Sequence, residues 1–263
     1  MLSSTLQQCN NRLPTYQCCK ENHICNCVNS LKDDFSIRPD TYNCQKKMDT
    51  YVLRYGLAYA SEIYHYLEAT NFQSKINLNQ PLIVKSLGCG FSPDYYAIKK
   101  YFEDYKIQTP INYTGLDSSS CWDLSRPITN ECNYVSYDLT SEFDISNADI
   151  LFICKVFSTL HRNDKGNDFL RNLQIASNQL KSGAIIVFID INNREMGRDV
   201  FHNNVKQYLP IFSQYYFDRE ENSYVGYEWE RINNTNIVFD SPNNLNVIPL
   251  QHAGKTVIFE YRK

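Results

Sequence analysis

From Pro81 to the end of the chain, short apolar runs alternate with amphipathic segments, and this alternation constrains the fold most strongly. Segments 92–106 and 169–183 have the three- and four-residue periodicity of helices. The run 184–191 is apolar except for Asp190, as in a strand buried on both faces. Strands that alternate with helices predict an α/β domain with a mainly parallel, doubly wound sheet and helices on both faces. The expected strands are 81–88, 111–117, 132–139, 148–157, 184–191, 236–240 and 254–263.

The part of the chain before residue 81 has a different character. Apolar and aromatic residues recur along 44–69 at helical spacing, which predicts one long amphipathic helix. Six of the ten cysteines lie within the first 44 residues. We therefore expect a cysteine-rich module over 1–45, a helix and connector over 46–80, and the α/β domain over 81–263.

A glycine turn follows the first expected strand. Gly88-Cys89-Gly90 is separated by one residue from a segment that begins with Ser92-Pro93. Proline suits the first turn of a helix, with Ser92 as its cap. In α/β proteins, such a turn places backbone amides beside a ligand at the carboxyl ends of the strands. A tight turn without any ligand remains the alternative for this motif alone.

Two acidic residues strengthen the ligand interpretation. Asp117 ends the strand over 111–117, 27 residues after Gly90, and Asp138 stands at the end of the next expected strand. An acid at such a position can accept hydrogen bonds from ribose hydroxyls. Two acidic strand ends beside one glycine turn indicate a nucleoside ligand.

These residues resemble the class I S-adenosylmethionine-dependent methyltransferases, over about residues 81–192. The resemblance rests on Leu87-Gly88-Cys89-Gly90, Tyr113-Thr114-Gly115-Leu116-Asp117, Tyr137-Asp138, Ala148-Asp149-Ile150-Leu151-Phe152 and Leu180-Lys181-Ser182-Gly183. It implies a Rossmann-like domain with a seven-stranded sheet, methyltransferase activity and S-adenosylmethionine as the cofactor.

The resemblance also implies roles for individual residues. Gly88 and Gly90 would pass the methionine end of the cofactor, Asp117 would hold the ribose hydroxyls, and Asp138 would meet the adenine amine. The full expected set of cofactor-binding residues is Gly88, Cys89, Gly90, Asp94, Asp117, Ser118, Asp138 and Leu139.

The sequence departs from the family pattern at two positions. Ser86 stands where the family usually has an acid, and Asp94 is the residue expected to replace that acid in part. Ser92 stands where a third glycine is frequent. A GxGxxG turn seats the pyrophosphate of nicotinamide cofactors, so the absence of this glycine argues against a nucleotide-dependent oxidoreductase.

No catalytic motif can be identified. The segment after the fourth strand of the resemblance has no Asn/Asp-Pro-Pro-Tyr stretch, and Cys154 reads as a buried inert thiol. Lys155 and His161 are the candidates for substrate contact at the carboxyl edge of the sheet. His161 could act as a base because the unperturbed pKa of histidine is about 6.5.

The N-terminal cysteines are candidate metal ligands, because structural zinc needs four thiolates or imidazoles within tetrahedral reach. The expected set is Cys18, Cys25, Cys27 and Cys44, with Cys9, Cys19 and His23 as alternates. Their spacing matches no standard zinc finger, so free or buried cysteines and an iron–sulfur or redox role stay open.

Composition limits the partners and the compartment. The formal charge of −3 gives no global positive field for nucleic acid. No secretory signal and no apolar stretch of membrane-spanning length is present, so we expect a cytoplasmic protein without a membrane partner. RNA is narrowly favoured as the methyl acceptor over a protein or small molecule. The alternative is a catalytically degenerate protein that keeps the fold as a binding or partner subunit.

Overall fold

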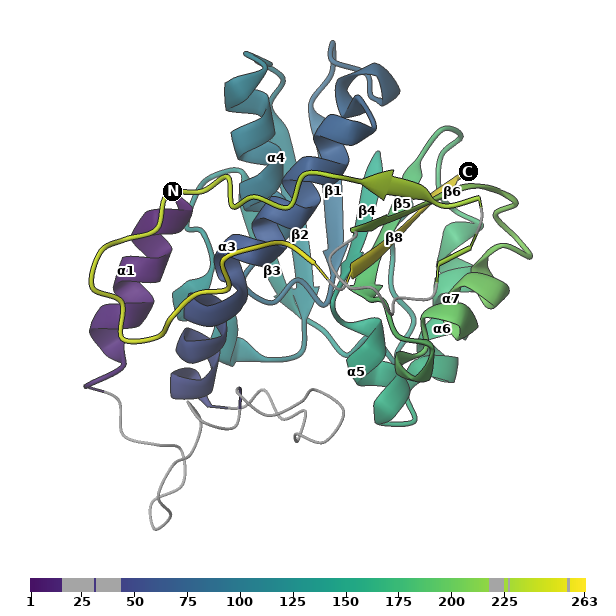
Figure 1. Cartoon of the computed structure of the whole chain (residues 1–263). Helices are drawn as coiled ribbons and strands as arrows, with labels where there is room; N and C mark the ends of the chain where they lie inside the picture. Colours follow the sequence, from purple (N-terminus) through teal and green to yellow (C-terminus); the bar gives the residue numbers. More distant parts are fainter. Residues whose placement is uncertain (16–30, 32–43, 218–224, 227, 255) are drawn as a thin grey trace.

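The computed structural model describes residues 1–15, 31, 44–217, 225–226, 228–254 and 256–263 (Figure 1). Within these residues, one sheet of eight strands carries helices on both faces. The helices are α1 (Leu2–Arg12), α3 (Gln45–Ala69), α4 (Pro93–Asp104), α5 (Phe157–Arg162), α6 (Gly166–Ser177) and α7 (Arg198–Val205), with short 3₁₀ turns η1 (Phe72–Lys75), η2 (Ser120–Ser125) and η3 (Arg194–Met196).

The strand order in the described sheet is β3-β2-β1-β4-β5-β8-β6-β7. The strands are β1 (Leu82–Leu87), β2 (Ile111–Asp117), β3 (Cys132–Ser136), β4 (Ile150–Cys154), β5 (Ile185–Ile191), β6 (Ile211–Phe217), β7 (Glu230–Ile232) and β8 (Thr256–Arg262). The first five strands are parallel, whereas β8 runs antiparallel to β5 and β6. The predicted mainly parallel, doubly wound α/β fold is confirmed.

The expected count of seven strands is wrong, since the described residues form eight. The expected strand over 236–240 is absent from the sheet, because this segment forms only an isolated bridge between Asn236 and His252. The strands β6 and β7 were not predicted. In β6, the polar residues within IFSQYYF obscure the alternation of buried and exposed positions. The third strand ends at Ser136, two residues before the expected Asp138.

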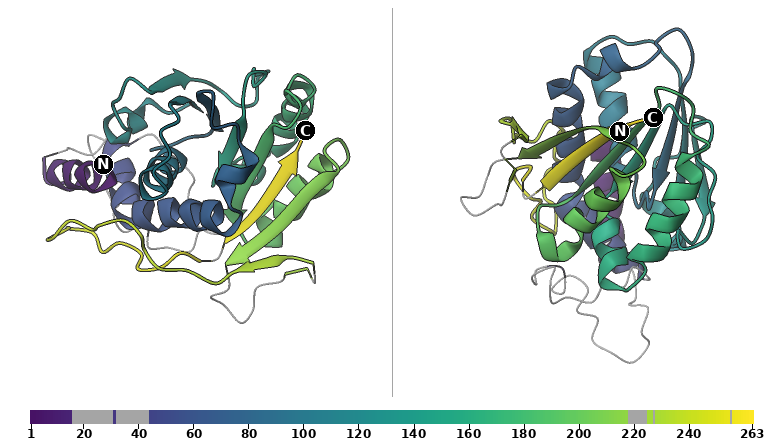
Figure 2. Two further views of the ribbon diagram at one scale, coloured as in Figure 1. Left: turned by 90° about the horizontal axis from the view of Figure 1, so that it is seen from above. Right: turned by 90° about the vertical axis from the view of Figure 1, so that its right-hand side faces the viewer.

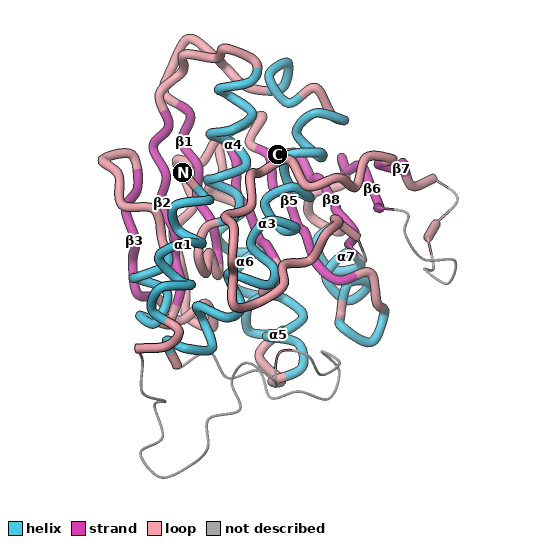
Figure 3. Tube along the Cα trace, turned by 60° about the vertical axis from the view of Figure 1, so that its left-hand side comes forward, coloured by secondary structure: helices cyan, strands magenta, loops and turns pink. Residues whose placement is uncertain are grey.

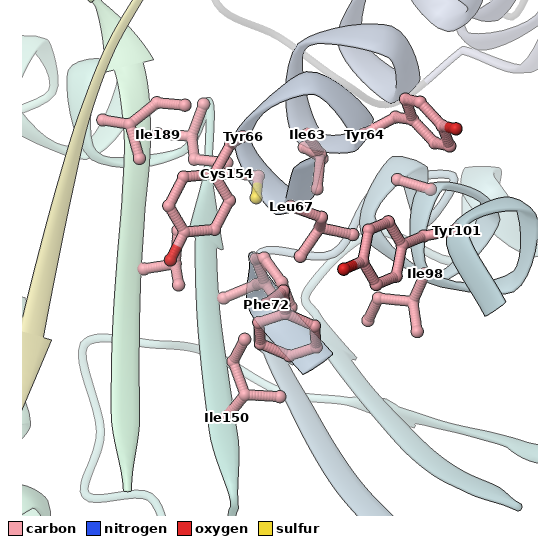
Figure 4. Packing of buried hydrophobic residues seen from close by; sticks show 14 of the residues in the cluster. Ile63, Tyr64, Tyr66, Leu67, Phe72, Ile98, Tyr101, Ile150, Cys154 and Ile189 are labelled. Atoms are coloured by element: carbon pink, nitrogen blue, oxygen red, sulfur yellow. The ribbon is translucent and has the colours of Figure 1, made fainter. Parts of the chain in front are cut away.

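Two hydrophobic clusters cover the two faces of the sheet. On one face, α3 and α4 pack on β1, β4 and β5 through residues such as Ile63, Tyr66, Leu67, Ile98 and Tyr101 (Figure 4). On the other face, α5, α6 and α7 pack on the same strands through Phe157, Phe169 and Phe201. Burial on both faces explains why β4 and β5 are apolar along almost their whole length.

The N-terminal helix and the segment before β8 extend the α3 layer. Figures 1 and 2 show α1 beside the first half of α3, with the chain from β7 to β8 running along α3 toward α1 and back. Asn10 accepts a hydrogen bond from the Asn246 amide at 2.7 Å, and Leu250 N donates to Arg54 O at 2.8 Å. These contacts hold three distant parts of the sequence in one layer.

None of the helices in the described part of the chain is long and apolar enough to cross a bilayer.

Candidate functional site

A cavity of about 800 Å³ opens at the carboxyl ends of the parallel strands. The strand order reverses between β1 and β4, and ligands of open α/β sheets bind in the crevice at such a switch point. The tube trace in Figure 3 follows β3, β2 and β1 side by side with α3 and α4 lying over them. The lining comprises Tyr51, Tyr59, Gly88, Cys89, Gly90, Phe91, Pro93, Asp117, Ser118, Ser119, Ser120, Cys121, Trp122, Asp138, Leu139, Cys154, Lys155, Val156, Thr159, Leu160, Asn163 and Lys165.

The turn after β1 needs glycine at its first position. Gly88 has φ of +65°, and a Cβ atom there would lie 2.3 Å from Val156 Cγ2. The amides of Gly88 and Cys89 both donate to Leu116 O, at 2.7 and 3.1 Å. The turn is therefore tied to β2, and its backbone lies against the segment that follows β4.

Arg126 supports this turn from a second, smaller cavity of about 350 Å³. Its Nε donates to Gly90 O at 2.9 Å, and its Nη1 pairs with Asp123 at 2.6 Å. The guanidinium also lies over the ring of Tyr134, 4.9 Å from the centroid. Sequence reasoning did not identify Arg126, because no pattern links it to the glycine turn.

Asp117 lies at the end of β2 and lines the cavity. Its Oδ2 accepts a hydrogen bond from Gly90 N and its Oδ1 accepts one from Ser119 N, each at 2.9 Å. Burial raises the pKa of the carboxyl, and these two amide donors oppose that rise. Each carboxylate oxygen has a further lone pair, so Asp117 can accept hydrogen bonds from a ligand's hydroxyl groups.

Asp138 lines the same cavity two residues beyond β3. The side chain is exposed, and its Oδ1 accepts hydrogen bonds from the amide and the hydroxyl of Thr140. These hydrogen bonds lower the pKa of Asp138, so the group is an anion at neutral pH. The cavity lining also includes Ser118 and the buried Leu139 together with the glycine turn.

Asp94 does not line the cavity, although it was expected to act there. It lies fully buried in the first turn of α4, where its Oδ1 accepts hydrogen bonds from Tyr113 and from Tyr95 N. Burial raises the pKa of Asp94 to about 6. Ser86 is also fully buried, so the position that usually carries the family's acid points into the protein rather than into the cavity.

Lys155 and His161, the two candidates for substrate contact, lie in different surroundings. Lys155 lines the cavity directly after β4, next to the buried Cys154. His161 is not part of the lining, since its ring stacks on Phe157 at 5.9 Å and lies against Gly197. From α5, the lining therefore includes Thr159 and Leu160 but not His161.

The Lys155 ammonium forms a network with α3 and β8. Its Nζ lies 3.0 Å from Glu62 Oε2, donates to the Thr256 hydroxyl, and lies 4.7 Å from the centroid of the Tyr59 ring. Glu62 is 2 % exposed and also accepts a hydrogen bond from Thr256 at 2.8 Å. Because Glu62 lies far from the glycine turn in sequence, only its position on the helix face could have suggested it.

Aromatic side chains form the cavity wall on the side of α3. Tyr51 and Tyr59 come from α3, Trp122 from η2 and Phe91 from the glycine turn. Tyr51 meets Tyr59 and Trp122 edge to face, with centroids 6.0 and 5.6 Å apart. The sequence carried a signal for part of this wall, because tyrosines at four-residue spacing lie on one side of a helix.

The metal site expected in the N-terminal segment falls mainly outside the described residues, which exclude Cys18, Cys19, His23, Cys25 and Cys27. Of the remaining expected ligands, Cys44 is buried at the start of α3. Cys9 is buried in α1 beside Ser125 and Arg12, and burial raises the pKa of its thiol to about 12. Among the described residues, no group of three or more His, Cys, Asp and Glu side chains could hold a metal ion.

No protein-family profile matches the sequence, and no curated protein matches it either. Solved structures resemble the chain at low identity. A complex of the Trm112 methyltransferase activator from Haloferax volcanii with a chain described as a methyltransferase matches at 14% identity, with 78% of this chain and 93% of that chain covered and a TM-score of 0.42. A TehB-like S-adenosylmethionine-dependent methyltransferase from Corynebacterium glutamicum matches at 14% identity, with coverage of 74% and 86% and a TM-score of 0.40.

A third similar structure is an S-adenosylmethionine-dependent methyltransferase from Mesorhizobium loti, with 20% identity, 47% of this chain covered and a TM-score of 0.31. The present chain spans about half of the length of that protein, 53%.

Proposed function

We propose that this protein is a methyltransferase that uses S-adenosylmethionine. The observation that carries the proposal is the hydrogen bond from Gly90 N to the Asp117 carboxylate. Both residues line a large cavity at the switch point of the sheet. Asp138 extends the same row of polar groups by one strand. An acid at the end of β2 and another beyond β3 suit a nucleoside whose ribose and base follow the strand edge.

The residues of the cavity fit this cofactor. Gly88 gives the turn its positive φ next to Val156, Asp117 retains lone pairs for ribose hydroxyls, and Asp138 stays ionised for the adenine amine. Cys89 and Ser118 would contact the cofactor through the turn and the strand end, and Leu139 would pack against the base. Asp94 would act only from behind the turn, because it is buried.

When bound, S-adenosylmethionine supplies a methyl group on a positively charged sulfur. The chain's own residues would bind the cofactor, orient the acceptor and exclude water, since methyl transfer depends mainly on positioning. In this proposal, Lys155 contacts the acceptor and His161 has no catalytic role, because the histidine lies outside the cavity lining.

Two further assignments remain proposals. RNA as the acceptor has no support from the charge of the described cavity, whose lining includes two lysines and two aspartates. Zinc bound by Cys18, Cys25, Cys27 and Cys44 can be tested directly by metal analysis of the purified chain. A protein partner and a cytoplasmic location also remain proposals.

A second candidate function is a methyltransferase-like protein that binds the cofactor without catalysis. The burial of Ser86 and Asp94 favours it, because neither offers a carboxylate to the cofactor's amino group. Binding of S-adenosylmethionine would distinguish both candidates from a protein that binds an unrelated ligand. Methyl transfer to an acceptor would then distinguish the two candidates from each other.

The first test is calorimetric titration of the full chain with S-adenosylmethionine and S-adenosylhomocysteine. We expect micromolar binding, and Asp117→Ala should weaken it by roughly 10- to 100-fold, because a hydrogen bond to a charged group contributes about 1.5–3 kcal/mol. The control is Glu103→Ala, which removes an exposed carboxylate at the far end of α4. Failure of the folded chain to bind either compound would reject the proposal, whereas binding without product from any acceptor would favour the second candidate.

A further inference from the structure

We propose that the methyl acceptor is an aromatic carboxylate, bound at the Lys155 end of the cavity. The inference rests on the proposed methyltransferase function and deepens it by naming the chemical class of the acceptor. It depends on the place of Lys155 along the strand ends, on the charged residues near it and on the aromatic residues that line the cavity.

The strand order indicates where the acceptor would lie in the cavity. Along the edge β3-β2-β1-β4, the lining residues are Asp138, Asp117, the glycine turn and Lys155 in that sequence. Neighbouring strands lie about 4.8 Å apart, so three intervals separate the ends of β3 and β4 by roughly 14 Å. With the nucleoside at Asp138 and Asp117, the reactive end of the cofactor lies near the glycine turn and the acceptor lies beside Lys155.

The fold holds the Lys155 ammonium at this place. The backbone of Lys155 has φ of +55°, a conformation that a residue with a side chain rarely adopts. Glu62 from α3 and Thr256 from β8 take two of the three N–H donors of the ammonium. Lys155 and Tyr59 both line the cavity, with the ammonium 4.7 Å from the centroid of the Tyr59 ring. In this proposal the third donor binds an oxygen of the acceptor.

The walls select a flat group. Tyr59 lies next to Lys155, and Tyr51, Trp122 and Phe91 continue the aromatic wall from there toward the glycine turn. Aromatic pairs favour stacked or edge-to-face contact. Tyr51 and Trp122 are also rigidly held, since each is less than a tenth exposed and they meet edge to face. A planar ring therefore fits between these side chains better than a branched aliphatic group.

The charges select a carboxylate over an amine. The two carboxylates in the described lining, Asp117 and Asp138, stand at the nucleoside end, and Glu62 lies behind Lys155 and outside the lining. An ammonium acceptor would meet Lys155 without a counter-ion of its own. No histidine belongs to the described lining, so an amine or a phenol would lack the usual base for its deprotonation. A carboxyl group, with a pKa of about 4, is already ionised at neutral pH.

The reaction balances without a base. One carboxylate oxygen of the acceptor forms a bond to the methyl carbon while the carbon–sulfur bond breaks and its electron pair stays on sulfur. The products are a methyl ester and S-adenosylhomocysteine, and no proton is transferred. The negative charge of the acceptor and the positive charge of the sulfonium cancel.

The test uses the full chain with S-adenosylhomocysteine present. Benzoate and indole-3-acetate are titrated by calorimetry beside the matched amines benzylamine and tryptamine. The same compounds are then incubated with S-adenosylmethionine, and methyl esters are detected by mass spectrometry. We expect both acids to bind and at least one to be esterified, with no measurable binding of the amines.

Two variants separate a binding role of Lys155 from a structural one. Loss of Lys155 alone would leave Glu62 buried without its counter-charge, which can unfold a protein. The comparison is therefore between Glu62→Gln, which keeps the cation, and the double variant Glu62→Gln with Lys155→Asn, in which asparagine tolerates the positive φ. The single variant should bind benzoate at least as tightly as the native chain, and the double variant roughly 10- to 100-fold more weakly.

Lys206→Asn is the control, because Lys206 is an exposed lysine at the end of α7 and lies outside the cavity lining. It should leave the affinity for benzoate unchanged. Equal binding of benzoate by the single and double variants would overturn the proposal, as would preference for the amines, or transfer to an RNA oligonucleotide with none to the acids. Since S-adenosylhomocysteine binding is measured in the same samples, loss of the cofactor site is distinguished from failure of the acceptor assignment.

Discussion

The backbone amide of Gly90 donates a hydrogen bond to the carboxylate of Asp117 at 2.9 Å, which joins the turn after β1 to the end of β2. This bond orients one oxygen of Asp117 toward the turn and leaves the carboxylate in the cavity wall. The position of the acid thus depends on the turn conformation, and a change to the glycines should affect the acid as well.

Gly88→Ala should destabilise the protein more than the positive φ alone explains. A left-handed residue with a Cβ costs about 1–2 kcal/mol, and the overlap with Val156 adds about 1–3 kcal/mol. Gly183→Ala is the matched control, because Gly183 has φ of +83° and nothing within 4 Å of its Cβ position. Urea unfolding should give a loss of about 2–5 kcal/mol for Gly88→Ala and about 1–2 kcal/mol for Gly183→Ala. Equal losses would show that Val156 yields without cost.

Asp94 should make the stability depend on pH. Its pKa is raised by burial from 3.8 to about 6 in the folded state, so the folded chain binds the proton more tightly than the unfolded chain. The stabilisation from this protonation is fully present below the unfolded pKa and is lost as the pH rises through about 6. The native chain should therefore lose up to about 3 kcal/mol relative to Asp94→Asn between about pH 4 and pH 6.5.

Unfolding curves of both proteins at several pH values within this window measure that difference. A difference in unfolding free energy that stays constant with pH would contradict the raised pKa of Asp94.

Cys121 should be alkylated in the free protein and protected by the cofactor product. It is partly exposed in the cavity lining, whereas Cys89 and Cys154 are buried there and burial raises the pKa of both thiols. Treatment with iodoacetamide, followed by peptide mapping, should show Cys121 alkylation slowed about tenfold by saturating S-adenosylhomocysteine. Cys132 is an internal control, since it lines only the second cavity. Similar slowing at Cys132 would indicate a general tightening of the structure instead.

Asp49 should be required for docking of α1. It is fully buried in α3 and accepts hydrogen bonds from Arg12 at 2.6 Å, Ser125 at 3.1 Å and Gln45 at 3.1 Å. Asp49→Ala would remove the buried carboxylate that pairs with Arg12, and breaking a buried ion pair costs about 3–5 kcal/mol. Thermal and urea unfolding should show this loss, while Gln8→Ala on the exposed side of α1 should stay within about 0.5 kcal/mol of the native chain. A loss below about 1 kcal/mol for Asp49→Ala would mean that α1 docks mainly by apolar contact.

Local pattern predicted most of the sheet, and its errors have identifiable causes. The strand over 111–117 was predicted at its observed bounds, because the apolar residues Ile111, Tyr113 and Leu116 are buried and Asp117 ends the segment. The segment 236–240 has the same apolar character but lies along α3, where Val238 N donates to Ser61 Oγ. Apolar residues next to a helix and apolar residues in a sheet give the same sequence signal, so only the tertiary contacts distinguish them.

The sequence by itself determined the α/β alternation, the glycine turn and the two acids in the cavity wall, because each follows from residues close together in the chain. Only the tertiary structure decided which groups stand opposite them. Glu62 and Thr256 are 194 positions apart, yet both bind Lys155, and α3 brings Tyr51 and Tyr59 to the same cavity. The tertiary structure also placed Asp94 and His161 outside the cavity lining. Such pairings depend on how helices pack across a sheet, which local periodicity does not encode.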